Sequence, residues 1–371
     1  MKNMNLSQKN LKQLIQIKSY SGQEKELADF IMAFCQKNNM PAENQDENII
    51  IKYLVGSKKC LIFNAHLDTV KEGSISSWTY PPFGKKAGII KDGKMFGLGS
   101  SDDKGGITSL LLLALEFKNK KTPIDLFFTF VVNEEIDGSG TESFVNYFID
   151  KFAKNYNDVS VIIAEPTNCK KIEIGHRGNI FLKLTTTGNS GHSSNPEKIT
   201  TKSIEKMIKI VSKIKKLEKE LQMFYFDDVL GYPTICLTGF NTSKSSINKI
   251  PSECNTTWDI RTTPLLHDKF INILGKKLGK DAEIELIGKP VSYGLTEKNS
   301  KIVNLFKKIV TDLEITISHS SNDSAFFTNI GIPAITFGPG NKEVIHQENE
   351  FVELENIKKS LSVYKNLINN Y

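Results

Sequence analysis

Two adjacent glutamates, Glu134 and Glu135, follow an apolar run at 124–132 that predicts a fully buried strand. Neighbouring carboxylates at the end of such a strand repel each other and lose hydration, so their charge needs compensation. A divalent metal ion would supply it, with one glutamate as a ligand and the other free to move protons. The alternative is a pair of solvated loop glutamates, and the rest of the chain decides between the two.

Other residues of metal-ligand type also follow predicted buried strands: His66 after 60–65, Glu165 after 159–164, and His346 a short loop after 333–337. In open α/β sheets, ligands bind at the edge where the carboxyl ends of the strands meet. Two histidines and three carboxylates suit a dizinc or similar centre. We therefore expect a two-metal site at this edge of the sheet.

Two aspartates extend this site. Asp68 lies two residues after His66, where it can accept the second ring N–H and fix the tautomer of the histidine. Asp102 lies at a glycine-rich turn ahead of a predicted helix, and its two oxygens could bridge two metals. We favour Glu135 as a ligand and Glu134 as the general base acting on a metal-held water, although residue type does not order that pair.

The elements that must position these residues alternate between strands and helices, which predicts a mostly parallel sheet flanked by helices in an α/β fold. From Asn179 to Ile287 the order changes to β-α-β-β-α-β, which predicts a ferredoxin-like α+β domain. We assign 1–177 and 291–371 to a catalytic domain and 178–290 to an inserted domain.

Near the start of the chain, residues 6–39 predict two helices. The segment between them, Ser21-Gly22-Gln23-Glu24, has the S-x-x-E form of a capping box at the start of the second helix.

The composition is that of a globular protein, with 371 residues, 39% of them apolar and 24% charged. There is no run of about 18 apolar residues, so no membrane span is expected, and the first residues lack an apolar signal core, which favours the cytoplasm. Five scattered cysteines predict reduced thiols and no zinc finger. The net charge of +6 comes from dispersed lysines, so we expect no nucleic-acid partner.

Arginine usage is unusual, because only Arg177 and Arg261 are arginines among 48 basic residues. Lysine supplies a point charge equally well, so these two positions either need the planar, bidentate guanidinium group or retain arginine by chance.

The motifs, in this order, resemble those of the M20 metallopeptidase and deacylase family over nearly the whole chain: His66-Leu67-Asp68, Gly97-x-Gly-x-x-Asp102-x-Lys-Gly, Glu134-Glu135, Glu165-Pro166 and the late His346. The family includes acetylornithine deacetylase, succinyl-diaminopimelate desuccinylase and carboxypeptidase G2. The resemblance implies a dizinc catalytic domain and a lid domain that forms a homodimer. It also implies that zinc fills the site, with cobalt or manganese as alternatives.

The resemblance further implies individual roles. His66 and Glu165 would hold one metal, Glu135 and His346 the other, and Asp102 would bridge them, while Glu134 would deprotonate the bridging water and pass the proton to the leaving amine. For the substrate side it implies these residues: His192 for the oxyanion, often from the partner subunit, Asn248 in the N-x-I-P motif, Arg261 in the D-x-R motif as a carboxylate clamp, Arg177 at the hinge, and Ser321 as a hydroxyl contact.

Two positions depart from the family pattern. Leu98 stands where arginine is usual, and Asp103 stands where methionine is common. Asp103 either tunes the affinity for metal or points to solvent.

We therefore predict a metal-dependent hydrolase of amino-acid biosynthesis that cleaves an amide bond next to a free carboxylate in an N-acyl amino acid. A dipeptidase or glutamate-type carboxypeptidase of the same family is the alternative. A homologue that binds metal without catalysis is a third reading, against which the spare base Glu134 argues.

Overall fold

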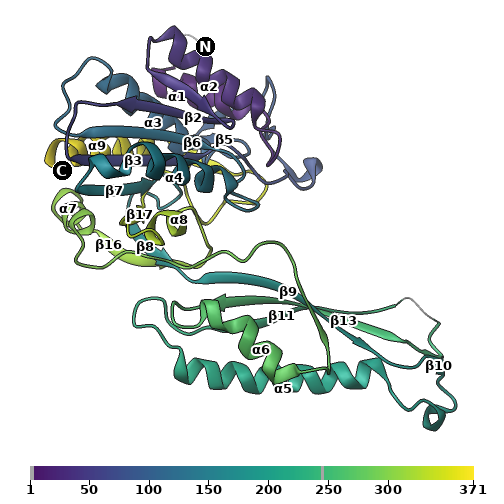
Figure 1. The fold of residues 1–371 in the computed structure, drawn as a ribbon. Helices are drawn as coiled ribbons and strands as arrows, with labels where there is room; N and C mark the ends of the chain where they lie inside the picture. The colour runs from purple at the N-terminus through teal and green to yellow at the C-terminus, as the bar shows by residue number, and fades with distance from the viewer. Residues whose placement is uncertain (1–3, 244–245) are drawn as a thin grey trace. The chain divides into compact units, whose positions relative to one another are not determined.

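Figure 1 shows the computed structural model of the protein, which describes residues 4–243 and 246–371. The chain forms two compact units. The first runs to Gly175 and resumes at Gly294–Ser318 and Asn322–Tyr371, and the second comprises His176–Tyr293 and His319–Ser321. The segment 178–290, predicted as an inserted domain, lies within the second unit.

The first unit is built on a sheet that has nine strands within the described residues: β1 (Ala42–Gln45), β2 (Asn48–Tyr53), β3 (Lys59–His66), β6 (Asp125–Val131), β7 (Asp158–Ile163), β8 (Lys171–His176), β15 (Gly294–Leu295), β16 (Glu314–Ser318) and β17 (Ala334–Thr336). The order is β1-β2-β6-β3-β7-β17-β8-β15, and β16 pairs with β8. The central strands β6, β3, β7 and β17 are parallel to one another. The α/β class predicted from the sequence is confirmed.

Helices cover both faces of this sheet: α1 (Leu6–Gln16), α2 (Lys25–Lys37), α3 (Lys104–Phe117), α4 (Ser139–Lys151), α7 (Lys301–Ile309), α8 (Ser324–Thr328) and α9 (Leu354–Asn370). Phe127 of β6 packs against Phe148 of α4, with ring centroids 5.5 Å apart. The next residue, Phe128, faces the other way and stacks on Phe63, which contacts Tyr364 of α9. Because successive strand residues point to opposite faces, a strand covered on both sides must be apolar throughout.

The predicted capping box at Ser21 is wrong. Helix α2 has Glu24 at its N-cap and no side-chain capping hydrogen bond. The hydroxyl of Ser21 instead donates to Asp68 at 2.8 Å. A capping box does form at the start of α1, between Asn5 and Gln8. The sequence pattern at Ser21 therefore marks a contact with the predicted site and not a helix start.

The sequence did not predict every strand. Strand β8 contains Glu173, which is 2% exposed, and Lys342 donates to both of its carboxylate oxygens at 2.8 Å. A second, three-stranded sheet pairs β4 (Ile89–Lys91) and β18 (Phe351–Glu353) with β5 (Lys94–Phe96). It ties the segment after His346 to the segment before Asp102.

The second unit contains β9 (Gly178–Thr187), α5 (Ser203–Phe224), β11 (Thr234–Thr242), β13 (Glu253–Thr262), α6 (Phe270–Leu278) and β14 (Glu283–Leu286). This β-α-β-β-α-β order builds an antiparallel sheet with the order β11-β13-β9-β14. Apolar residues of both helices pack on one face of the sheet around Trp258. The predicted ferredoxin-like architecture is thus observed. Among the helices described here, none is long and apolar enough to cross a membrane.

Candidate active site

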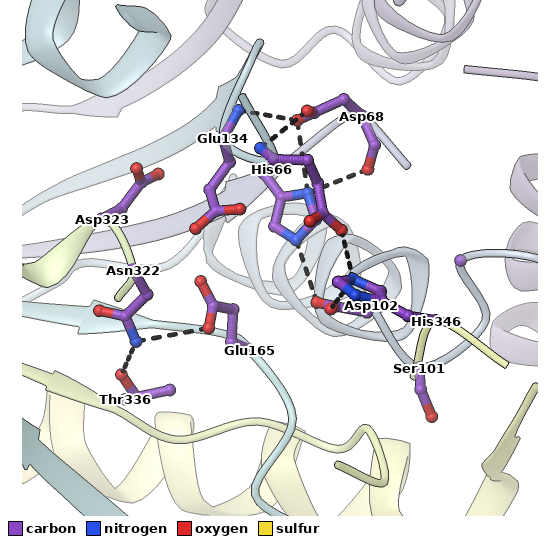
Figure 2. A network of polar contacts seen from close by, with 12 residues as sticks. His66, Asp68, Ser101, Asp102, Glu134, Glu165, Asn322, Asp323, Thr336 and His346 are labelled. Carbon is purple, nitrogen blue, oxygen red and sulfur yellow. Dashed lines mark hydrogen bonds and ion pairs between the residues drawn. The ribbon is translucent and has the colours of Figure 1, made fainter. Parts of the chain in front are cut away.

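The parallel register of the central strands brings the predicted site residues to one edge of the sheet (Figure 2). His66 is the last residue of β3 and pairs with Val131 at the end of β6. Glu134 and Glu135 follow β6 by a few residues, and Glu165 follows β7, which runs parallel to β3 on its other side. Since these strands are parallel, their carboxyl ends lie at the same edge of the sheet, and their ligand-type side chains converge there.

The carboxylate of Asp68 is the centre of a hydrogen-bond network. It is fully buried, and its oxygens accept the backbone N–H groups of Glu134 and Glu135, each at 3.0 Å. The hydroxyl of Ser21 donates to it as well. Nδ1 of His66 lies 3.5 Å from the Asp68 carboxylate and 3.0 Å from its backbone carbonyl. A proton on Nδ1 therefore binds the Asp68 carbonyl and leaves Nε2 for a metal.

Asp102 lies between the two histidines. Its Oδ1 is 3.0 Å from Nε2 of His66, and its Oδ2 is 3.6 Å from Nε2 of His346. Nε2 of His346 also lies 2.8 Å from Oε1 of Glu135. Each oxygen of one carboxylate thus faces a different imidazole, which is the arrangement that a bridging ligand of two cations requires.

Two groups of described residues offer ligand atoms that all lie within 4.8 Å of one another: His66 with Glu134 and Glu135, and Asp102 with Glu135 and His346. Glu165 is in neither group. One of its oxygens lies 3.4 Å from Nδ2 of Asn322, and the other is buried without a hydrogen-bond partner. In Figure 2 the side chain of Glu134 points toward that of Glu165. An orphaned buried carboxylate oxygen at such a cluster favours a cation.

The electrostatics of the cluster point the same way. Burial, together with the charge of Asp102, raises the pKa of Glu165 to about 8, and burial beside Glu165 raises the pKa of Glu134 well above its usual range. Hydrogen bonds to Asp102 and Glu135 raise the pKa of His346 to about 10. Burial would lower the pKa of His66, but its contacts with Asp102 and Asp68 raise it well above its ordinary value. The site therefore attracts positive charge strongly.

Sequence reasoning missed three buried polar residues around this cluster, Asn322, Asp323 and Glu350, which are 2–6% exposed. Asp323 accepts from Asn64 at 3.0 Å and from Thr141 at 2.6 Å, and burial raises its pKa to about 6. The available signals were weak, because Asn322 and Asp323 only adjoin Ser321, and Glu350 only follows His346 by four residues.

Asp103 is fully buried, so the alternative that it points to solvent is wrong. Neither of its oxygens has a hydrogen-bond partner, and burial raises its pKa well above the usual range. Leu98 is 5% exposed and belongs to the core. An arginine at that position would have to be buried with its charge.

The remaining predicted site residues lie in the second unit. His192 and Asn248 come together where β10 (Gly191–His192) pairs with β12 (Lys249–Ile250), and Nδ2 of Asn248 lies 3.2 Å from Nε2 of His192. Both side chains are exposed. Ser321 belongs to the short piece of chain that is grouped with this unit.

The two arginines contact different partners. Arg261 makes a bidentate pair with Asp259, with distances of 2.9 and 3.0 Å, and Arg177 donates to the carbonyl of Tyr232 at 2.8 Å. Burial, followed by the charge of Arg261, lowers the pKa of Arg177. The two guanidinium groups of the second unit therefore lie near enough for their charges to repel each other, and Asp259 pairs with that of Arg261.

Comparison with known proteins agrees with this geometry. The model of the family described as peptidase family M20/M25/M40 matches residues 62–370, which include every residue of the cluster around Asp102. The chain belongs to this family. It is therefore an M20 family hydrolase.

Curated M20 relatives include two kinds of deacylase. An acetylornithine deacetylase of Buchnera aphidicola is 30% identical over 347 residues, which cover 90% of this chain and 86% of that protein. A succinyl-diaminopimelate desuccinylase of Wolbachia pipientis is 28% identical and covers 97% of this chain and 92% of its own length.

Solved M20 structures share the fold. A metallo-carboxypeptidase from Sulfolobus solfataricus superimposes with a TM-score of 0.80 at 21% identity and covers 99% of both chains. A Bacillus subtilis protein, described as a dinuclear metal binding peptidase from the M20 family, superimposes with a TM-score of 0.70 at 13% identity and covers 98% of this chain and 96% of its own.

Proposed function

We propose that this M20 hydrolase removes the acyl group from an N-acyl amino acid by cleaving the amide bond next to a free carboxylate. The observation that carries the proposal is the placement of Asp102, whose two oxygens face His66 and His346 at 3.0 and 3.6 Å. The two curated relatives, named for deacetylation and desuccinylation, support an acyl group as the part that is removed.

We propose two divalent metal ions as cofactors, with zinc as the first choice and cobalt or manganese as alternatives. His66 and Glu165 would hold one ion, Glu135 and His346 the other, and Asp102 both. The orphaned oxygen of Glu165 and the raised pKa values of both histidines support this set. When bound, such ions polarise the scissile carbonyl and ease the ionisation of water.

The protein's own groups handle the proton. Glu134 is the proposed general base, because its carboxyl group lies in the cluster while its backbone is fixed by Asp68. Its pKa, raised by burial and by Glu165, makes it a strong proton acceptor once it is ionised. It would take the proton from water and deliver it to the leaving amine, while Asp68 holds His66 in one tautomer.

The substrate would be recognised by residues of the second unit. His192 and Asn248, which lie 3.2 Å apart, are proposed to stabilise the oxyanion that develops on the carbonyl. Arg261 and Arg177 are proposed to bind the substrate carboxylate, and Ser321 to add a hydroxyl contact. The repulsion between the charges of the two arginines supports an anionic substrate group, which would relieve it.

A peptidase of the same family is the second candidate, because the solved structures with this fold include a protein named as a metallo-carboxypeptidase. A panel of N-acetyl, N-succinyl and dipeptide substrates, with and without added zinc, distinguishes the two by the amine that is released. We expect metal-dependent turnover of an N-acyl amino acid. No turnover of any member of the panel, by protein that carries two metals, would contradict the enzymatic role.

Arg261→Lys tests the recognition of the carboxylate. Lysine keeps the charge but loses the bidentate geometry, so we expect kcat/KM to fall by a factor that corresponds to about 1–3 kcal/mol. Thermal unfolding of the variant provides the control, because the pair with Asp259 is also lost. Kinetics like those of the wild type would mean that the arginine has no role in recognition.

A homodimer formed through the second unit and a cytoplasmic location remain predictions. Sedimentation of the purified protein tests the first. We expect the mass of two chains of 41.6 kDa.

A further inference from the structure

One buried side chain, that of Glu350, accepts hydrogen bonds from the backbone of the turn at 99–102, which carries Asp102. Glu350 is 2% exposed, and its Oε2 accepts the backbone N–H of Gly99 at 2.7 Å. Its Oε1 accepts the N–H of Ser101 at 2.7 Å and that of Asp102 itself at 3.0 Å. Three donors from four consecutive residues thus converge on one carboxylate.

The same stretch of chain makes further contacts with this turn. The carbonyl of Glu350 accepts the N–H of Gly97 at 3.0 Å. The hydroxyl of Ser101 donates to the carbonyl of Phe351 at 2.6 Å and accepts the N–H of Asn341 at 2.9 Å. Strand β18 then pairs with β5 directly before the turn. The segment that carries His346 is therefore attached on both sides of that residue to the turn that carries Asp102.

We propose that Glu350 is a positioning residue of the metal centre, which fixes the backbone of Asp102 and couples its place to that of His346. The inference rests on the proposed two-metal site. In that site Asp102 would present one oxygen to each metal, so a small rotation of its backbone would move both oxygens at once. A carboxylate suits this task, because each of its two oxygens has two lone pairs and three N–H donors can therefore converge on it.

Substitution by glutamine changes this arrangement in a defined way. Glutamine has the shape of glutamate but carries one N–H₂ group, which cannot accept a hydrogen bond. In Glu350→Gln the N–H₂ group takes the place of one carboxylate oxygen. If it replaces Oε2, the N–H of Gly99 loses its acceptor; if it replaces Oε1, the N–H groups of Ser101 and Asp102 lose theirs. In either case the amide N–H₂ then faces a backbone N–H, and two donors meet. Glu350→Asp keeps the charge on a side chain that is one methylene shorter, and should restore part of the function.

The chain offers a matched control at the opposite end of β6. Asp125 is 4% exposed, and its Oδ1 accepts the backbone N–H groups of Val55 and Ser57 at 2.8 and 3.1 Å. It is thus a second buried carboxylate that holds a turn, but that turn carries no proposed ligand. Asp125→Asn should destabilise the fold in a similar way without touching the metal centre.

The experiment measures the affinity for Zn²⁺ by competition with a chromophoric chelator, and the absorption spectrum of the Co²⁺-loaded protein. We expect Glu350→Gln to weaken Zn²⁺ binding by about 10- to 100-fold and to alter the cobalt spectrum. Glu350→Asp should lie between this variant and the wild type. Asp125→Asn should match the wild type in both measurements despite a lower melting temperature.

If both Glu350 variants bind Zn²⁺ and Co²⁺ like the wild type, Glu350 only supports the fold and the inference is wrong. The same holds if Asp125→Asn weakens binding as much as Glu350→Gln. If the wild type itself binds no metal, the proposed function fails together with the inference. Should Glu350→Gln not fold, the affinity of Glu350→Asp alone decides, and an unchanged value would overturn the proposal.

Discussion

Strand β6 has a carboxylate near each end, buried at Asp125 and half-buried at Glu134, and the two ends are built differently. At its start, both oxygens of Asp125 are hydrogen-bonded, one to two backbone N–H groups and the other to the hydroxyl of Tyr156 at 2.9 Å. Beyond its end, Glu134 faces the charge of Glu165, and one oxygen of Glu165 has no partner. The protein thus supplies hydrogen-bond donors to both oxygens of Asp125, whereas it leaves one oxygen of Glu165 without a donor.

The difference shows how one sheet can separate stability from chemistry. A buried carboxylate whose hydrogen bonds are all made stabilises the fold around it. A cluster of carboxylates that repel one another is retained at a cost in stability, and that cost is offset when protons or metal cations bind.

Glu134→Ala should remove the proposed base and leave the loop backbone in place, because Asp68 binds the backbone N–H of this residue. We expect kcat to fall by a factor on the order of 10²–10⁴ while the metal content stays near that of the wild type. Steady-state kinetics and metal analysis of the same sample provide the check. Loss of a metal would instead show that Glu134 is a ligand and that the roles of Glu134 and Glu135 are exchanged.

Removal of metal should make the stability depend on pH in one direction. The pKa of Glu165 is raised to about 8 and that of His346 to about 10, so both groups bind protons more tightly in the folded state. Their contribution is complete at low pH and is lost as the pH rises through these values. We therefore expect the melting temperature of metal-free protein to fall between about pH 5 and pH 9.

Protein saturated with zinc is the control for this pH series, because bound cations take over the role of the protons. Its melting temperature should vary less across the same range. A metal-free protein that becomes more stable toward pH 9 would contradict the charge balance described for the cluster.

The smallest effects should come from a matched pair of hydroxyl deletions. Ser21→Ala removes a donor to Asp68, and Tyr156→Phe removes a donor to Asp125. Each should lower the free energy of unfolding by about 1 kcal/mol. Only Ser21→Ala should also lower kcat, by a few-fold, because Asp68 holds the proposed base. Equal kcat values for both variants and the wild type would remove this distinction between the two ends.

Much of the fold followed from periodicity. The continuous apolar run before Glu134 predicted a strand covered on both faces, and the structure places Phe127 and Phe128 against helices on opposite sides. The ferredoxin-like order of the second unit was also predicted. Strand β8 was missed because Glu173 interrupts its pattern, and the compensating Lys342 is 169 residues away in the chain.

The part of the candidate site that lies at the ends of strands could be predicted from the sequence. His66, Glu134 and Glu165 lie at or within three residues of the ends of apolar strands, so local sequence was sufficient to bring them together. Glu350 and Ser21 could not be found in this way, because their contacts join turns that are far apart in the chain. The S-x-x-E pattern at Ser21 even suggested a helix cap, since a serine hydroxyl serves equally well in either place.

The anchoring of Glu134 and Glu135 through their backbone N–H groups has a consequence for how this site can change. Asp68 binds the backbone at the two positions and not the two side chains, so any residue that keeps its backbone N–H, which excludes proline, can make the same hydrogen bonds. New functional groups can be introduced at 134 and 135 by mutation, in nature or in the laboratory, without rebuilding the scaffold beneath them. The side chains at these two positions can therefore change while the backbone of the loop stays in place.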